Sequence, residues 1–124
     1  MATRTPGLEP HHASLAPLSS RYIDVPSLPW QPTRFPGVEI KVLVEDPDTG
    51  LATVLTRMAP GATLTDHEHV EIEQTWVLEG SLVDHEGEAT AGTFVWRPAG
   101  SRHVATAPKG ALLLGIFQKP NKFY

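Results

Sequence analysis

The stretch GATLTDHEHVEIEQTWVLEG, residues 61–80, decides how this chain is interpreted. It places His67 and His69 one residue apart, Glu73 four residues later, and a glycine at each end of a β-rich run. Side chains alternate between the two faces of a strand, so His67 and His69 project to the same side while Glu68 points away. Two imidazoles placed in this way can bind one ion together.

Two further residues can complete such a site. A turn after His69 would bring Glu73 back from the next strand, and His103 can arrive from a strand distant in the sequence. Three neutral nitrogens and one carboxylate suit Fe(II), Mn, Zn, Ni or Cu, and they leave coordination positions open for water, substrate or dioxygen. We therefore predict one divalent transition metal per chain (Fe, Zn, Ni or Mn), with His67, His69, Glu73 and His103 as its ligands.

Composition limits the other functions of the chain. Its 124 residues contain no cysteine, which excludes disulfides, thiolate metal sites and cysteine nucleophiles. The net charge of −4 is spread over scattered charged residues, so nothing indicates binding to nucleic acid or anionic lipid. The N-terminus lacks the apolar run of a signal peptide, and no segment approaches the roughly 20 apolar residues of a membrane span. We expect a cytoplasmic protein with a small-molecule substrate or ligand.

Proline divides the chain into two parts. Seven of the twelve prolines lie within the first 36 residues, and each removes a backbone donor and fixes φ. Residues 1–20 are predicted to be a flexible tail, and residues 21–124 the folded domain. The domain would begin with an extended arm, at about residues 21–36, whose apolar side chains lie along the domain or along a second subunit. We predict a homodimer in part from these side chains, which are Tyr22, Ile23, Val25, Trp30 and Phe35.

The remainder of the chain has the pattern of short strands separated by turns. Residues 38–59 read as a hairpin, because two runs rich in β-branched residues flank the turn sequence DPDTG. The runs TLTDHEH, IEQTWVLEG, SLVDHEG, GTFVWRPAG, SRHVATAP and ALLLGIFQK follow. No amphipathic helix is indicated, because the apolar positions alternate or run together. The fold class is therefore all-β, a barrel or a sandwich.

Two motifs carry a resemblance to a known family. The first is a glycine, five residues, His-x-His, three residues, Glu, six residues and a glycine, from Gly61 to Gly80. The second, GTFVWRPAGSRH, runs from Gly92 to His103 with glycine, proline, glycine and histidine in order. With both motifs the chain resembles the cupin superfamily. The acidic turn DHEGE and the following stretch make it similar to small single-domain cupins of the ChrR type and to the β-diketone-cleaving cupin dioxygenases.

The resemblance implies a cupin double-stranded β-helix (jelly-roll barrel), often a homodimer, with a divalent metal inside. Glu73 is preferred over its neighbour Glu71 as the carboxylate ligand because it keeps the motif spacing. The chain departs from the family pattern at Ala107, where an asparagine is usual. That departure leaves the expected metal ligands intact and concerns only the pocket beside them.

Other residues are assigned by strand alternation and flanking position. His85 is expected in a solvated turn, and His11 and His12 in the tail are interpreted as adventitious. Trp76 and Trp96 are expected in the core or at an interface. The predicted pocket is mostly apolar and suits a small organic molecule. Its candidate lining residues are Thr75, Ala105, Ala107, Met58 and Phe117.

Three functions are compatible with these residues. The first is a metal-dependent dioxygenase of the Fe(II) type acting on a small carbonyl or diketone compound, for which a strict three-histidine site would be best suited. The alternatives are a non-catalytic zinc-binding sensor or binding cupin, and a Lewis-acid metal isomerase or lyase in which Glu73 moves a proton. We find no other catalytic motif, so the metal set favours an enzyme without deciding between catalysis and binding.

Overall fold

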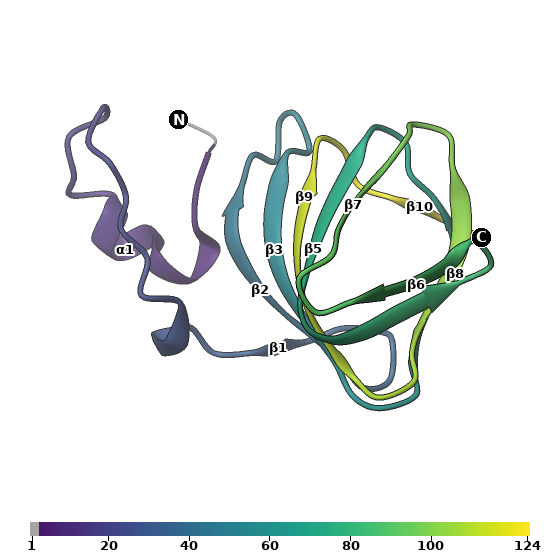
Figure 1. Ribbon diagram of the computed structural model, residues 1–124. Helices are drawn as coiled ribbons and strands as arrows, with labels where there is room; N and C mark the ends of the chain where they lie inside the picture. The colour runs from purple at the N-terminus through teal and green to yellow at the C-terminus, as the bar shows by residue number, and fades with distance from the viewer. Residues whose placement is uncertain (1–2) are drawn as a thin grey trace.

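The computed structural model describes residues 3–124, and about half of them lie in antiparallel strands of a curled sheet. The strands are β1 (Gln31–Pro32), β2 (Val38–Glu45), β3 (Ala52–Met58), β4 (Ala62–Glu68), β5 (Glu73–Asp84), β6 (Gly87–Thr90), β7 (Phe94–Arg97), β8 (Arg102–Ala107), β9 (Ala111–Phe117) and β10 (Lys122–Phe123). The prediction of an all-β jelly-roll barrel is confirmed (Figure 1).

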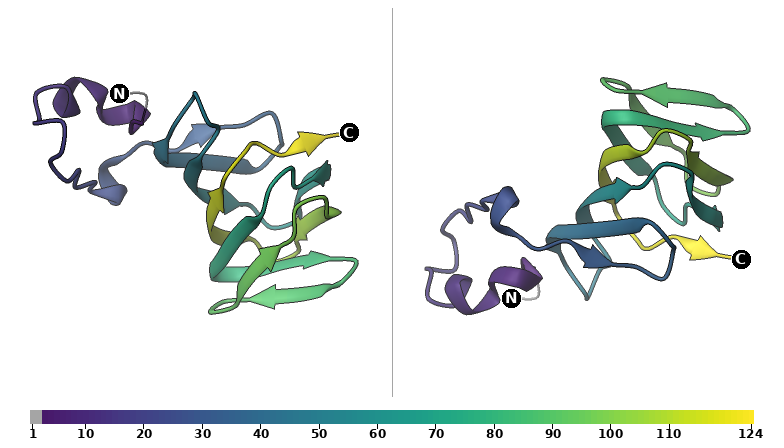
Figure 2. Two further views of the ribbon diagram at one scale, coloured as in Figure 1. Left: turned by 90° about the horizontal axis from the view of Figure 1, so that it is seen from above. Right: turned by 90° about the horizontal axis from the view of Figure 1, so that it is seen from below.

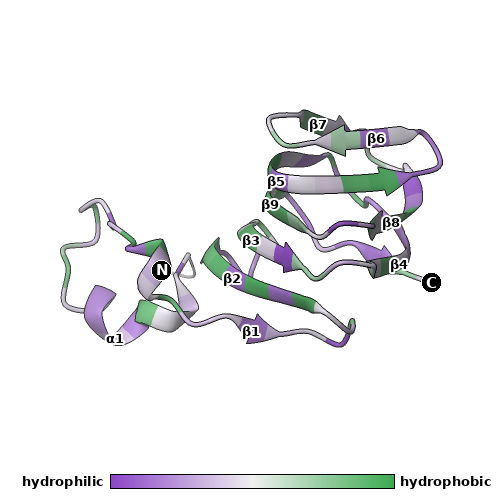
Figure 3. Cartoon of the chain, turned by 60° about the horizontal axis from the view of Figure 1, so that its bottom comes forward, coloured by the Kyte–Doolittle hydropathy of each residue, from purple (hydrophilic) through white to green (hydrophobic). Residues whose placement is uncertain are grey.

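The strands follow the order β1-β2-β3-β9-β5-β8-β4-β10, with β6 and β7 both paired to β5. The predicted hairpin of residues 38–59 is formed by β2 and β3. Apolar and polar residues alternate over residues 38–42 of β2 (Figure 3), but burial does not follow this period, because the buried residues of the strand are Val38 and Lys41. The buried side chains between the curled halves of the sheet include Val38, Met58, Val77, Leu82, Ala105, Ala107 and Leu113.

Strand β5 corrects one detail of the sequence interpretation. The runs IEQTWVLEG and SLVDHEG were expected as two strands, but they form one strand of 12 residues. Its first half pairs with β7 and β9, and its second half pairs with β6. The strand bends at Gly80, where φ is +74° and an added Cβ would lie 2.0 Å from the Gly110 carbonyl oxygen. Only glycine fits this bend, which carries one strand through both halves of the barrel.

The N-terminal segment stands beside the barrel, next to β2 (Figures 1 and 2). It contains the 3-10 turns η1 (Pro6–Leu8) and η2 (Val25–Ser27) and the one-turn helix α1 (Glu9–His12). Arg4 exchanges two backbone hydrogen bonds with Glu45 on β2, and the buried hydroxyl of Thr5 donates to the Leu43 carbonyl at 2.6 Å. The flexibility of residues 1–20 and the domain boundary at residue 21 stay predictions; residues 1–2 lie outside the described part of the chain.

The side chains of Trp76 and Trp96 do not lie in the core, which was one of the two positions predicted for them. Trp76 and Trp96 were expected in the core or at an interface, but they are 49% and 60% exposed, so they are not core residues. They lie on the outer face of β5 and β7, because Glu73 and Thr75 on the same strand face inward.

Among residues 3–124, no helix is long and apolar enough to cross a membrane.

Candidate metal centre

A bulge in β4 turns the two histidines of the His-x-His pair toward the barrel interior. Leu64 pairs with Ala105 and His67 with His103, so the two β4 residues between these pairs face a single residue of β8. The extra residue reverses the alternation, so buried Ala62 is followed by buried His67 and His69 on the same side. The predicted common face of His67 and His69 is thus observed, and the bulge turns that face toward the barrel interior.

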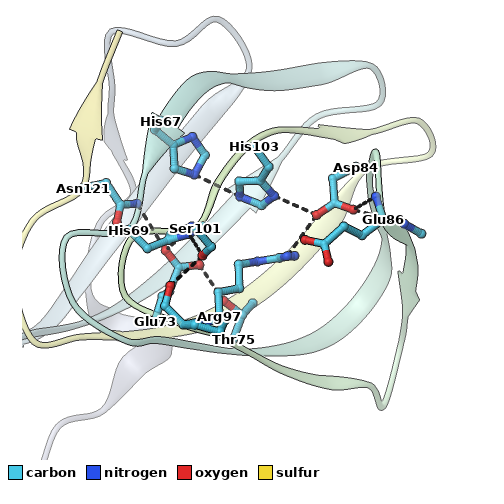
Figure 4. Close-up of polar contacts among 12 residues, drawn as sticks. His67, His69, Glu73, Thr75, Asp84, Glu86, Arg97, Ser101, His103 and Asn121 are labelled. Carbon is cyan, nitrogen blue, oxygen red and sulfur yellow. Dashed lines mark hydrogen bonds and ion pairs between the residues drawn. The ribbon is translucent and has the colours of Figure 1, made fainter.

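Three imidazoles meet inside the barrel. Each of His67, His69 and His103 offers a ring nitrogen within 4.8 Å of the others, and their exposures are 2%, 0% and 6%. The Nε2 atoms of His67 and His103 are 3.1 Å apart. Two nitrogens bound to one ion at about 2.0–2.1 Å would lie roughly 2.9–3.4 Å apart, for angles from a right angle to tetrahedral. The spacing fits a shared metal ion (Figure 4).

The hydrogen bond made by Nδ1 determines the tautomer of both His67 and His103. His67 Nδ1 lies 2.7 Å from the Thr65 carbonyl oxygen, which can only accept, so Nδ1 carries the hydrogen. His103 Nδ1 lies 2.7 Å from the Asp84 carboxylate, which also accepts. In the neutral rings, both Nε2 atoms therefore present lone pairs to each other, an arrangement that a cation between them stabilises.

His69 has the same tautomer for a less direct reason. Its Nδ1 lies 2.9 Å from the Ser101 hydroxyl oxygen, and that hydroxyl donates its own hydrogen to the Pro98 carbonyl at 2.7 Å. Ser101 must therefore accept from His69 Nδ1, which leaves a lone pair on His69 Nε2. Within the described residues this buried Nε2 atom has no hydrogen-bond partner. A buried polar atom without a partner, beside two other lone pairs, is expected at a metal site.

Burial keeps the His69 and His103 rings in the form that binds metal. Burial lowers the pKa of His69 more than the charge of Glu73 raises it. Burial also lowers the pKa of His103, and its hydrogen bond to Asp84 only partly offsets that effect. Neutral imidazole, the ligand form, is therefore favoured at neutral pH.

Asp84 and Arg97 form a buried ion pair behind His103. Asp84 Oδ2 accepts from His103 Nδ1 and also from Arg97 at 2.9 Å, while Oδ1 accepts the backbone N–H groups of Glu86 and Gly87. Burial alone would raise the pKa of Asp84, but the hydrogen bonds from His103 and Glu86 and the charge of Arg97 lower it. The pair orients the His103 ring, as the residue behind a metal-binding histidine usually does.

Glu73 lies next to the three histidines. It is the first residue of β5 and is 8% exposed, and its Oε2 is 3.3 Å from His69 Nε2. This separation lies within the range that two ligands of one ion take, so Glu73 as the fourth ligand stays a prediction. Glu71 does not belong to the cluster. The carboxylate also accepts hydrogen bonds from Thr75 and Asn121.

The predicted pocket residues fall into two places. Thr75 and Phe117 share the face of Glu73, since Phe117 is its partner on β9, and buried Ala105 and Ala107 share the face of His103. Met58 lies at the other end of β3, where it lines a cavity of about 390 Å³ to which none of the three histidines contributes. His85 is exposed in the turn after Asp84, and His11 lies exposed in α1 beside half-buried His12.

A smaller cavity adjoins the site residues. It occupies about 240 Å³ next to β6 and β7, and Asp84, Arg97 and Ser101 line it together with apolar Leu82, Ala89 and Val95. None of the three histidines lines this cavity, and Asp84 and Ser101 contact two of them only at Nδ1.

Sequence reasoning missed the residues that orient the histidines. Asp84, Arg97 and Ser101 all lie in stretches that the family resemblance used, so a signal for them existed. Asn121 and Phe123 had none. Phe123 pairs with His67 across β10 and β4, and their rings are 5.0 Å apart.

The barrel and its inward-facing histidine cluster define a cupin with a site that could hold a metal ion. The sequence profile described as ChrR Cupin-like domain matches residues 18–121, so the chain belongs to that family. A search of curated protein sequences returns no significant match.

Solved structures show the same fold. A protein from Methylibium petroleiphilum PM1, proposed to be an acetylacetone dioxygenase, matches with a TM-score of 0.79 and 21% identity over 89% of this chain and 84% of its own. An acetylacetone dioxygenase from Acinetobacter johnsonii matches with a TM-score of 0.73 and 18% identity over 89% and 80%. The anti-sigma factor ChrR of Rhodobacter sphaeroides, in its complex with SigE, matches at 0.64 and 21% over 75% and 50%.

Proposed function

We propose that this cupin is a metal-dependent dioxygenase of the Fe(II) type that acts on a small carbonyl or diketone compound. The observation that supports it is the donor set: three imidazole Nε2 lone pairs meet at one buried point, each fixed by a different acceptor on Nδ1. A divalent metal held there by His67, His69 and His103 would supply a Lewis acid and, in the case of iron, one-electron chemistry with dioxygen.

The residues of this chain supply binding and orientation. The 240 Å³ cavity is lined by none of the three histidines and by none of the predicted pocket residues, so it is not assigned to the substrate. Arg97 acts through Asp84, which holds the His103 ring in its orientation. Two structural neighbours bear the name acetylacetone dioxygenase, and small diketones are the substrates that we would test first.

A second candidate is a Lewis-acid isomerase or lyase. The buried carboxylate of Glu73 lies 3.3 Å from His69 Nε2, close enough to move a proton on a substrate held at the same point. Such a reaction would proceed without oxygen, which separates it from the first proposal. A zinc-binding sensor would bind a ligand and convert none.

Elemental analysis of the untagged protein is the first test, followed by anaerobic reconstitution with Fe(II) and oxygen-uptake assays over small diketones and aromatic ketones. We expect iron-dependent uptake that His103→Ala abolishes and His85→Ala retains. Tightly held zinc or nickel without uptake would contradict the dioxygenase. Substrate conversion in the absence of oxygen would then support the isomerase or lyase.

We also infer a homodimer of a cytoplasmic protein. Of the arm residues that motivated this prediction, Tyr22 is 89% exposed, whereas the Trp30 ring packs against Lys41 and Arg57. A second apolar surface supports association, because Trp76, Phe94, Trp96 and Ile116 are all exposed. Light scattering on a size-exclusion peak should give twice the chain mass, and a monomer would remove the inference.

A further inference from the structure

Residues 118–124, the C-terminal strap, cross one end of the barrel from one half of the curled sheet to the other. They follow β9, which lies between β3 and β5, and they include β10, which pairs with β4 (Figures 1 and 2). At this end Phe117, the last residue of β9, pairs with Glu73. Phe123 of β10 pairs with His67. The strap therefore crosses the end of the barrel that holds the histidine cluster.

The ring of Phe123 packs against the first histidine of the cluster. Its centroid lies 5.0 Å from that of His67 and 5.0 Å from that of Phe35. The Arg34 guanidinium lies 4.8 Å from the centroids of both phenyl rings. Phe35 comes just before β2, whereas Phe123 pairs with β4, and these two strands are far apart in the strand order. The two phenyl rings thus close the barrel between strands that do not follow each other in the sheet.

Closure of this end matters because the histidines are buried. The three rings are at most 6% exposed, so a substrate that binds an ion among them must displace a side chain that covers them. The strap is the covering element with the shortest strand, since β10 pairs with β4 over two residues whereas β4 and β8 pair over five. A segment with few backbone hydrogen bonds opens at a lower free-energy cost than the strands beneath it.

Side-chain contacts hold the strap in place. The Tyr124 hydroxyl donates to the Glu68 carboxylate at 2.8 Å, and the Arg102 guanidinium lies 3.6 Å from the centroid of the Tyr124 ring. The Asn121 amide donates to the buried Glu73 carboxylate at 3.2 Å (Figure 4). The Tyr124 hydrogen bond is exposed, so water can replace it at little cost. The closed strap is therefore stabilised by contacts that can break and form again.

We propose that the C-terminal strap is a lid over the metal centre, and that the Phe123 ring is the group that a substrate displaces to reach the ion. This inference rests on the metal centre of the proposed function. Phe123 then determines the size of the molecules that are admitted: a small ion passes beside the ring, whereas a planar bidentate molecule requires the strap to open. Because Phe123 is not a metal ligand, it controls access to the ion and not the affinity for it.

Protein loaded with Co(II) tests this inference without turnover, because its visible absorption changes when a new ligand binds the ion. The probes are azide, which is small, and tropolone, which is planar and bidentate, and stopped-flow absorption would give the association rate of each. We expect Phe123→Ala to speed the association of tropolone by at least about tenfold and that of azide by less than about threefold. Its Co(II) affinity should stay within about threefold of native. Tyr124→Ala loosens the strap and keeps the Phe123 ring, so it should speed tropolone by a smaller factor.

Phe94→Ala is the matched control, because it removes the same ring from β7, where the side chain is 54% exposed, and it should change neither rate. Tyr124→Ala tests the inference even if Phe123→Ala fails to fold. Native tropolone rates in both strap variants, or equal acceleration in Phe94→Ala, would overturn the inference and leave the metal centre standing. Equal acceleration of azide and tropolone would overturn the selection by size. Native protein that binds no Co(II) would overturn the metal centre itself, and this inference with it.

Discussion

The histidines inside the barrel differ from those outside it in their exposure and in the hydrogen bonds of their rings. His67, His69 and His103 are at most 6% exposed, and each has an acceptor on Nδ1. His85 is exposed in a turn one residue after Asp84, the residue that holds His103. The difference shows that the fixed tautomer and the buried lone pair, rather than the number of histidines, make a metal site.

Removing one histidine from each group should give the largest effect. His103→Ala deletes one of three converging lone pairs, and we expect it to weaken metal binding by at least about a hundredfold. His85→Ala should leave metal content unchanged. Metal-to-protein ratios after dialysis against a weak chelator would measure both. Equal retention in the two variants would show that the cluster is not where the metal binds.

Two glycines with similar φ angles test whether a close backbone contact in the barrel contributes to stability beyond the backbone conformation itself. Gly80 and Gly61 both have φ near +80°, but an added Cβ meets the Gly110 carbonyl at Gly80 and nothing within 4 Å at Gly61. We expect Gly80→Ala to lower the free energy of unfolding by more than about 2 kcal/mol, and Gly61→Ala by about 1 kcal/mol. Urea unfolding of the two variants would measure this. Equal losses would mean that backbone conformation alone, and not the contact, makes Gly80 necessary.

Much of the fold and part of the site could be predicted from the sequence. Apolar alternation located most strands, and the spacing of His67 and His69 predicted their common face. Strand alternation could not reveal the bulge between Leu64 and His67, because the extra residue is defined by the partner strand β8. The two runs that merge into β5 were separated because a glycine normally marks a turn, whereas Gly80 marks a bend within a strand.

The residues around the histidines were harder to predict for a different reason. Asp84 contacts a residue 19 positions away, and Asn121 contacts one 48 positions away. No local period encodes such pairs, since only the folded barrel brings them together. The outward position of Trp76 and Trp96 likewise depends on which face of β5 carries Glu73, which the motif spacing alone leaves open.

Replacing Asp84, which orients the His103 ring, should reduce metal affinity less than replacing His103 itself. Asp84→Asn keeps an acceptor near Nδ1 but removes the charge that Arg97 and His103 share, so we expect a 10–100-fold loss of metal affinity. Asp66→Asn is the matched control, because Asp66 pairs with Arg102 on the surface. Competition with a coloured chelator would measure both affinities. If Asp84→Asn kept the native metal affinity, Asp84 would serve only to stabilise the turn at residues 84–87.

The pH dependence of the metal-free protein distinguishes the buried histidines from the exposed ones without any metal. Burial lowers the pKa of His69 and His103 in the folded protein. In the unfolded chain the pKa of both residues is about 6.5. Below that pH the unfolded state takes up protons that the folded barrel does not yet accept, so the free energy of unfolding should fall as the pH decreases. Urea unfolding at about pH 7.5 and about pH 5.5 would measure the change. The variant His69→Gln/His103→Gln should lose part of this dependence, and His85→Gln should keep all of it. A metal-free protein that becomes more stable on acidification would show that the two buried rings do not control its stability in this range.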